Sequence, residues 1–122
     1  MIAFLNDVKK NYKLLSTISF MAIVEYQINR EKLEKAAFIL RTVAHPTRLA
    51  IVDLLDRNAR LSVNEIGQIL NVEQSLLSHH LTTMKLKGIL RSEKEGQSVF
   101  YSLKEKDVTK IIACIEHCDC NM

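Results

Sequence analysis

The chain has 122 residues, of which 48% are hydrophobic and 25% are charged, with three glycines and one proline. A single domain is expected at this length, and the scarcity of turn residues favours helices. The formal net charge of +3 permits nucleic-acid binding without requiring it. All three cysteines lie within residues 114–122, and their odd number argues against a disulfide-stapled secreted fold.

An apolar run at residues 14–24 lies near the N-terminus. It is shorter than the roughly 20 apolar residues that cross a bilayer, and it contains Ser16, Thr17 and Ser19. Lysines precede it as in a signal peptide, but Glu25 follows instead of a small-residue cleavage site. We therefore predict a buried or dimer-forming helix over residues 1–30, no membrane contact and a cytoplasmic protein.

The stretch up to residue 44 contains neither proline nor glycine and predicts nearly continuous helix. A break is expected near residues 27–30, where Asn29 is a suitable cap for a second segment. His45 ends that segment, because the residue before a proline is pushed out of the helical region. Pro46 suits the first turn of the next helix, which is expected to continue to Arg57.

A helix-turn-helix pattern follows in the middle of the chain. Ser62 stands three residues before Glu65, a capping-box spacing that opens a helix ending at Asn71. A further helix is expected from Gln74 to Lys87, with Gly88 as its C-terminal cap. Two short helices joined by about three residues form the DNA-binding motif, whose second helix reads the duplex.

The periodicity then changes to that of strands. Residues 89–92 and 98–103 are β-like and flank a charged turn that contains Gly96. A hairpin directly after a recognition helix is a wing, and a final helix is expected over residues 104–118. The predicted fold is mainly α with a small β-hairpin wing, in the order α-α-α-α-α-β-β-α. Residues 1–30 would form an N-terminal dimerisation helix and residues 31–122 a winged helix-turn-helix domain with a C-terminal dimerisation helix.

Four segments carry a family resemblance: L-R-T-V-A-H-P-T-R-L-A-I-V (40–52), Q-S-L-L-S-H-H-L (74–81), K-G-I-L (87–90) and E-G-Q-S-V-F-Y-S-L (95–103). In this order and spacing they resemble the ArsR/SmtB winged-helix repressors over roughly residues 34–118. The resemblance implies a homodimer that binds a palindromic DNA operator and is released or modulated by a metal ion or another chemical signal.

The residues expected to contact DNA follow from the exposed first half of the recognition helix, which enters the major groove. They are Gln74, Ser75, Ser78, His79 and His80. Lys85 and Arg48 are further candidates for contacts to the DNA phosphates, and Lys94 and Gln97 are candidates for contacts from the wing to DNA. The resemblance marks His80 as DNA-facing through the pattern S-x-H-L. An internal ion pair with an acid such as Asp53 is the alternative for Arg48.

The wing is expected to be a weak basic element. Glu93 and Glu95 offset the charge of Lys94, and Gln97 stands where many relatives have an arginine. This mild charge leaves a second function open, a winged-helix protein-interaction module without specific DNA binding. No catalytic pattern is present, and Cys118 and His117 diverge as helix neighbours, so we do not expect an enzyme.

The resemblance also suggests where a metal would bind. A cysteine pair in the helix before the recognition helix, used by arsenic or cadmium sensors, is absent here. In the register of the zinc-type sensors the ligands of the last helix fall on Glu105, Asp107 and Cys118, with His117 or Cys120 replacing Asn121, a poor ligand. Zn2+, Cd, Co or Ni would suit such a site.

Helix geometry bears on this site. On a continuous helix, Asp107 and Cys118 lie about 16 Å apart along the axis, so a shared site needs the same helix from a second chain. Three alternatives remain open. They are a local site of Cys114, His117 and Cys118, redox or reactive-sulfur sensing by the C-terminal cysteines, and a chain with no sensor in which Cys114 is a small core residue at the dimer interface.

Overall fold

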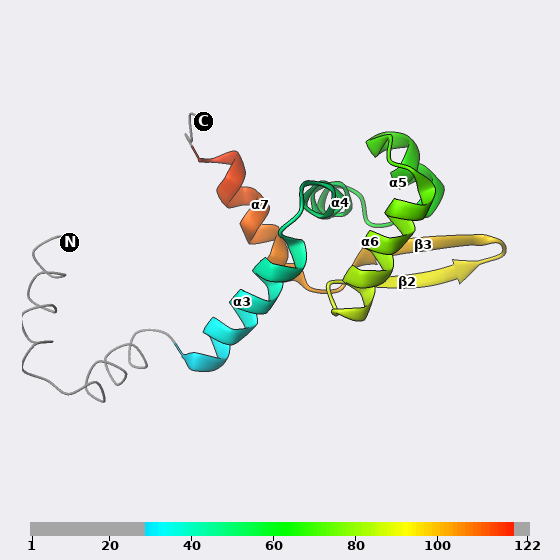
Figure 1. The fold of residues 1–122 in the computed structure, drawn as a ribbon. Helices are drawn as coiled ribbons and strands as arrows, with labels where there is room; N and C mark the ends of the chain where they lie inside the picture. The colour runs from blue at the N-terminus through cyan, green and yellow to red at the C-terminus, as the bar shows by residue number, and fades with distance from the viewer. Residues whose placement is uncertain (1–28, 119–122) are drawn as a thin grey trace, which may run out of the picture. The chain divides into compact units, whose positions relative to one another are not determined.

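The computed structural model describes residues 29–118 of the chain (Figure 1). The predicted N-terminal dimerisation helix and Cys120 therefore lie outside the described residues. The chain divides into two compact units, Met1–Phe38 and Ile39–Met122, and the residues that concern function lie in the second. The elements are α3 (Arg30–Val43), α4 (Pro46–Arg57), β1 (Leu61–Ser62), α5 (Val63–Leu70), α6 (Gln74–Leu86), β2 (Leu90–Glu95), β3 (Ser98–Leu103), the short 3-10 helix η1 (Lys106–Val108) and α7 (Thr109–Glu116). This confirms a mainly helical winged fold.

Side-chain caps begin the first two described helices. The Asn29 carboxamide oxygen accepts the backbone N–H of Glu31 at 2.8 Å before α3. His45 does the same for α4, because its Nδ1 accepts the N–H of Thr47 at 3.1 Å. Pro46 occupies the first position of α4, where no N–H is needed. These two helix starts were predicted at the right residues.

The helix-turn-helix begins and ends as its sequence predicts. Ser62 and Glu65 form a capping box, with the Ser62 hydroxyl accepting from Glu65 N–H at 3.1 Å and the Glu65 carboxylate accepting from Ser62 N–H at 3.0 Å. Asn71 ends α5 in the left-handed region at φ 52°, and Gly88 follows α6 at φ 80°. The capping box therefore marks the start of the motif, Asn71 the end of α5 and Gly88 the end of the motif.

The sheet has three antiparallel strands in the order β1-β3-β2. The wing hairpin pairs Leu90 with Leu103 and Glu95 with Ser98, so it is longer than predicted at its first strand. Strand β1 was not predicted from the sequence. Leu61 pairs with Tyr101 across the sheet, a contact between distant residues that no local pattern indicates.

The C-terminal helix is shorter than predicted. It was expected over residues 104–118, but the structure has η1 followed by α7, which spans eight residues. The Glu105 carboxylate accepts the N–H of Asp107 at 3.1 Å, and the Thr109 hydroxyl donates to the carbonyl of Lys106 at 2.8 Å. These bonds hold a tight turn in place of the first helical turn. The face that Asp107 was expected to share with Cys118 on one continuous helix is therefore not formed.

One apolar core holds the DNA-binding motif together, and α4 packs against α5, α6 and α7. Helix α6 contributes Leu77, Leu81 and Met84, which are fully buried, and it lies against the wing strand β2. The opposite face of α6 is thereby directed away from the core (Figure 1). Among the described helices, none is long and apolar enough to span a membrane.

Candidate nucleic-acid interface

The exposed face of α6 carries four of the predicted DNA contacts. Gln74, Ser75, Ser78 and His79 are all exposed. Because the buried side chains of α6 repeat at helical spacing, the remaining positions of its first two turns point to solvent together. The Ser75 hydroxyl donates to the Glu73 carboxylate at 2.7 Å. Its oxygen is consequently left as an acceptor for a donor on a base or the backbone.

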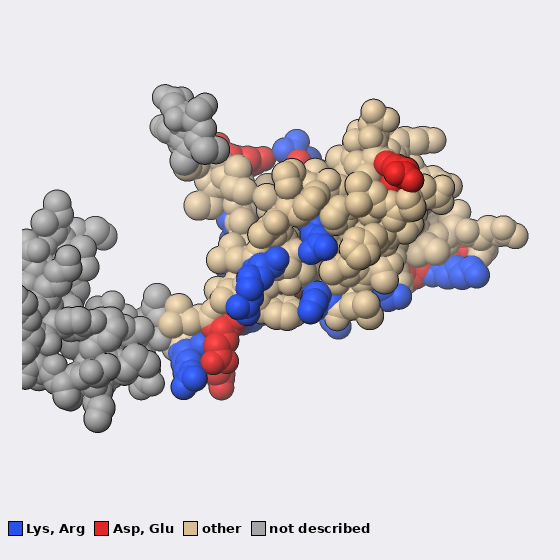
Figure 2. Space-filling view, viewed as in Figure 1, with Lys and Arg blue, Asp and Glu red and all other residues tan. Residues whose placement is uncertain are grey.

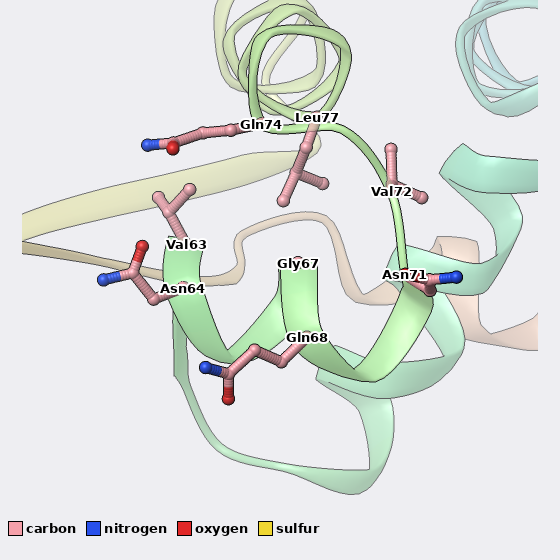
Figure 3. A pocket seen from close by; sticks show the side chains of 8 residues that line it. All are labelled: Val63, Asn64, Gly67, Gln68, Asn71, Val72, Gln74 and Leu77. Atoms are coloured by element: carbon pink, nitrogen blue, oxygen red, sulfur yellow. The ribbon is translucent and has the colours of Figure 1, made fainter.

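Two shallow hollows adjoin this face. One, of about 370 Å³, lies between α5 and α6 and is drawn in Figure 3. The other, of about 340 Å³, lies between the start of α6 and the wing, where Ser78, Gln97 and Ser98 contribute to its wall. Asn64 and Gln74 line both hollows, and in Figure 3 their carboxamides extend to the same side. Among residues 29–118, no lysine or arginine lines either hollow, so the polar groups offered here are neutral amides and hydroxyls.

Sequence reasoning missed Asn64. It is the second residue of α5 and it is exposed, directly after the capping box. A polar residue at the exposed start of the first motif helix was the available signal, since this helix crosses the DNA backbone in such motifs.

The wing is held by an arginine that sequence reasoning also missed. Arg60 donates two hydrogen bonds to the Glu95 carboxylate, at 2.7 and 2.8 Å, and its Nη1 lies 3.9 Å from the carboxylate of Glu93. The guanidinium carbon also lies 4.1 Å from the centre of the Phe100 ring. The hydrogen bond from Arg60 lowers the pKa of Glu95. The acids that were expected to weaken the wing are therefore partly neutralised within the domain, while Lys94 and Gln97 remain exposed.

Arg48 forms hydrogen bonds within the domain in place of the ion pair considered from sequence. Its Nη1 donates to the carbonyl of Thr42 at 2.8 Å and its Nε donates to Nδ1 of His80 at 3.1 Å. Asp53, the expected partner, pairs instead with Arg57 one turn later, at 3.0 Å. The ion pair predicted as the alternative is therefore wrong, and Arg48 is half-buried against α6.

His80 lies inside the domain. It is only 4% exposed, and its ring centre is 4.5 Å from that of His45 and 6.0 Å from that of His79. Burial lowers the pKa of His80, and the nearby His45, Arg48 and His79 lower it further. The ring does not reach the outer face of α6 in this conformation, so His80 is not positioned to contact DNA.

The remaining predicted cations are on the surface. Lys85 lies near the end of α6 and Lys94 near the tip of the wing, and both are exposed. On the face drawn in Figure 2, basic side chains are scattered over a largely uncharged surface, with basic and acidic atoms side by side at the wing. A strong non-specific attraction to DNA is not expected from such a surface.

The predicted metal ligands are not gathered within one chain. Among residues 29–118, no three His, Cys, Asp or Glu side chains are close enough to hold a metal ion. In the described conformation, Cys114, His117 and Cys118 are therefore not gathered into such a group. The Asp107 carboxylate pairs with Lys110 at 3.1 Å, and Glu105 caps η1. The predicted site joins two chains, so a single chain does not test it.

The cysteines differ in their surroundings. Cys114 is a free thiol that is exposed in the single chain, and its predicted place at a dimer interface is not tested by one chain. Cys118 follows the end of α7 and is disulfide-bonded. An oxidised Cys118 offers no thiolate to a metal ion, so any metal binding there requires reducing conditions.

Comparison with known proteins identifies the family. Residues 45–92 match the family described as "Bacterial regulatory protein, arsR family". The chain is 39% identical over 89 residues to the transcriptional repressor PagR of Bacillus anthracis, across 73% of this chain and 89% of PagR. The chain belongs to the arsR family.

Solved structures of arsR-type regulators agree with the fold. HlyU from Vibrio cholerae N16961 superposes with a TM-score of 0.66 at 33% identity, over 77% of this chain and 100% of HlyU. A cadmium resistance transcriptional regulatory protein CadC homolog from Staphylococcus aureus is 30% identical over 97 residues, across 74% of this chain and 80% of that relative. Together they confirm the predicted family and the winged helix-turn-helix. This arsR-family chain is a DNA-binding transcriptional regulator, and the family is one of regulators rather than enzymes.

Proposed function

We propose that the chain is a transcriptional repressor that binds a specific operator as a homodimer, with α6 in the major groove. One observation carries this proposal: Leu77, Leu81 and Met84 of α6 are buried in the core, while its polar residues Gln74, Ser75, Ser78 and His79 are exposed. Such a helix is held firmly by the domain while its side chains remain available to base edges. The relative PagR is named a repressor, which supports this direction of regulation.

Three side chains are assigned to the reading of bases. The Gln74 carboxamide can both donate and accept, which matches the N6 and N7 edge of adenine. The Ser75 oxygen, whose proton is engaged by Glu73, accepts from an amino group such as that of cytosine. His79 is exposed beside them and donates to a base or a phosphate.

The DNA backbone is contacted by both charged and neutral groups. Lys85 and Lys94 are exposed at the end of α6 and in the wing, where they neutralise phosphates. Ser78 and Gln97 face the hollow between α6 and the wing and donate hydrogen bonds without charge. Few cations take part, so the salt dependence of binding should be modest.

A second copy would cover apolar surface that the single chain leaves exposed. On α3, Leu33 and Leu40 are 41% and 51% exposed, and on α7 Ile115 is 53% exposed. Apolar residues at helical spacing without a core to cover them are typical of a helix that packs in an oligomer. Residues 1–30 stay a predicted addition to this interface.

The repressor proposal is tested by binding of the purified dimer to the DNA upstream of its own gene, with a scrambled duplex of equal length as competitor. Specific binding at low protein concentration is the expected result, together with lower expression from that promoter when the protein is present. Equal binding to both duplexes would support the protein-interaction module instead. Raised expression would make the protein an activator, as the relative HlyU is named.

For the signal, we propose a metal ion bound across the dimer. Glu105 and Asp107 lie before α7, and His117 and Cys118 lie after it. The eight residues of α7 separate the two pairs by about 12 Å, so ligands from both ends meet only when a second chain contributes. Carboxylate, imidazole and thiolate together suit zinc, cadmium, cobalt or nickel. The relative whose name includes cadmium resistance supports a metal signal.

This proposal has a direct spectroscopic test. The reduced dimer is titrated with Co(II) and Cd(II), and thiolate-to-metal absorption is followed together with operator release. An absorption band that is lost in Cys118→Ser but kept in Cys114→Ser is expected. Operator release by oxidant or persulfide in the absence of metal would assign the signal to redox or reactive-sulfur chemistry at the cysteines, for which the disulfide-bonded Cys118 is the supporting observation.

A further inference from the structure

The recognition helix α6 contains a buried histidine that the reading of bases does not use. His80 is 4% exposed. The one hydrogen bond that its imidazole ring forms within the described residues is accepted by Nδ1 from Arg48 Nε at 3.1 Å. The same guanidinium donates through Nη1 to the carbonyl of Thr42 at 2.8 Å. Through these two bonds, one arginine of α4 joins α6 to the end of α3.

The hydrogen bond between Arg48 and His80 determines the protonation state of the imidazole ring. An arginine side chain is always protonated and only donates, so His80 Nδ1 must present a lone pair. His80 is therefore the neutral tautomer that carries its proton on Nε2. Nε2 has no partner among the described residues. A leucine would fill this space without an unpaired polar atom, so the acceptor at Nδ1 is the property that distinguishes histidine here.

We propose that His80 is a positioning residue for operator binding, one that fixes the rotation of α6 through Arg48 and the Thr42 carbonyl without touching DNA. This inference rests on the proposed function, because it concerns the placement of α6 in the groove. Ser78 and His79 immediately precede His80 on the same helix. A rotation or shift of α6 about this position would displace His79 from the base or phosphate, and Ser78 from the DNA backbone, that we propose they contact.

Acid should break the hydrogen bond from Arg48 to His80, which is the anchor of α6. A second proton on the ring would occupy Nδ1, remove the acceptor for Arg48 and place two cations in contact. The charged or titratable groups that face the ring are His45 from the residue before α4, Arg48 from α4 and His79 from α6 itself. From α3, Thr42 contributes a backbone carbonyl to Arg48. All three side chains disfavour a charged His80, so the neutral, anchored form is the one present at neutral pH.

Three variants separate positioning from simple packing. His80→Asn keeps an acceptor near the place of Nδ1 but does not titrate, and His80→Leu fills the space without an acceptor. Arg48→Lys keeps the charge but loses the fork that reaches two acceptors at once. Operator affinity is measured for each variant against a range of salt concentrations, and again between about pH 8 and pH 6. Urea unfolding and dimer mass are measured in parallel as controls on folding.

We expect His80→Leu and Arg48→Lys to weaken operator binding about three- to tenfold, the worth of one hydrogen bond, with an unchanged dependence on salt. His80→Asn should retain most of the affinity, and it should lose less affinity than the wild type when the pH is lowered. Wild-type affinity in both His80→Leu and Arg48→Lys would overturn the proposal. A fourth variant, Arg48→Gln, removes the charge. A fall of about one in the slope of its log affinity against log salt would also overturn the proposal, since Arg48 would then contact a phosphate.

A measurement without DNA completes the test. The 15N resonances of the imidazole should show the Nε2-protonated tautomer for His80 in the free wild-type dimer, and this signature should be lost in Arg48→Lys. The opposite tautomer would overturn the inference even if operator binding is specific. A wild type that does not distinguish its operator from scrambled DNA would instead refute the proposed function, and the tautomer would still decide whether the anchor exists. If His80→Leu fails to fold, Arg48→Lys and His80→Asn decide the outcome.

Discussion

Arg60 and Glu95 form a two-pronged ion pair, with N–O distances of 2.7 and 2.8 Å, between the connection after α4 and the tip of β2. The pair is exposed, and single exposed pairs contribute little to global stability. Its geometry is nevertheless specific, because the guanidinium also lies over Phe100 of β3. The pair therefore orients the wing more than it stabilises the fold.

We expect Arg60→Lys to loosen the wing without unfolding the domain. Lysine cannot reproduce two parallel hydrogen bonds to one carboxylate. Backbone amides of β2 and β3 should exchange hydrogen faster, with little change in the urea midpoint. Glu93→Gln is the matched control, since Glu93 lies at 3.9 Å and should have a smaller effect. Unchanged exchange in Arg60→Lys would show that the hairpin orients itself.

The Arg60–Glu95 pair should also depend on pH. Because Arg60 lowers the pKa of Glu95, the contribution of the pair to stability is present above the ordinary carboxyl pKa and is lost as the pH falls below it.

Gln74→Ala should reduce operator affinity and relax specificity at one base pair. An amide bonded in both directions to adenine contributes about 1–3 kcal/mol of discrimination. Competition between operators that differ at single positions would locate the pair. Asn58→Ala is the matched control, because Asn58 carries an exposed carboxamide after α4 and lines neither hollow. Equal losses in the two variants would contradict the assignment.

Lys85→Ala should weaken binding to every DNA sequence alike. Removing one phosphate contact lowers the slope of log affinity against log salt by about 1. Lys104→Ala removes an equally exposed charge that lies before η1, outside the motif and the wing, and should leave the slope unchanged. A loss confined to the operator would mean that Lys85 reads a base.

Stability should fall in mild acid because of His80. The pKa of His80 is lower in the folded protein than in the unfolded chain. Near the ordinary histidine pKa, the native protein therefore binds fewer protons than the unfolded chain. The stabilisation is thus complete above about pH 6.5 and declines as the pH falls below it. Urea unfolding at several pH values checks this. A variant with His80→Asn should show a smaller decline, and an identical decline would assign the effect to other histidines.

Ser62→Ala should destabilise the domain by about 1 kcal/mol, the usual cost of removing a helix cap. The Ser62 hydroxyl is the acceptor for the N–H of Glu65, and Ser62 is buried. Ser98→Ala, at an exposed position of the wing, is the control. Equal urea midpoints for the two variants would show that water replaces the cap.

The parts of the fold that were predicted correctly depend on short-range chemistry. Asn29, Ser62 and Gly88 each act within a few residues of their own position, so the sequence around them contains the whole signal. Strand β1 was missed for the opposite reason. Leu61 becomes a strand residue only because Tyr101, forty positions later, lies beside it.

The burial of His80 could have been found from the sequence. Leu77, His80, Leu81 and Met84 follow the helical spacing of one face, and all four are buried. The family pattern S-x-H-L predicts a His80 that faces DNA, whereas the helical periodicity places it on the buried face. The partner of the ring could not have been found in this way. Nothing local to Arg48 indicates that it bonds a residue 32 positions away.

The neutral lining of the two hollows beside α6 has a consequence for how the regulator finds its target. A surface that gains affinity from amides and hydroxyls releases few counterions, so it holds random chromosomal DNA weakly. The many competing sites of a genome then sequester a smaller share of the protein. A small number of molecules per cell would suffice to keep one promoter occupied.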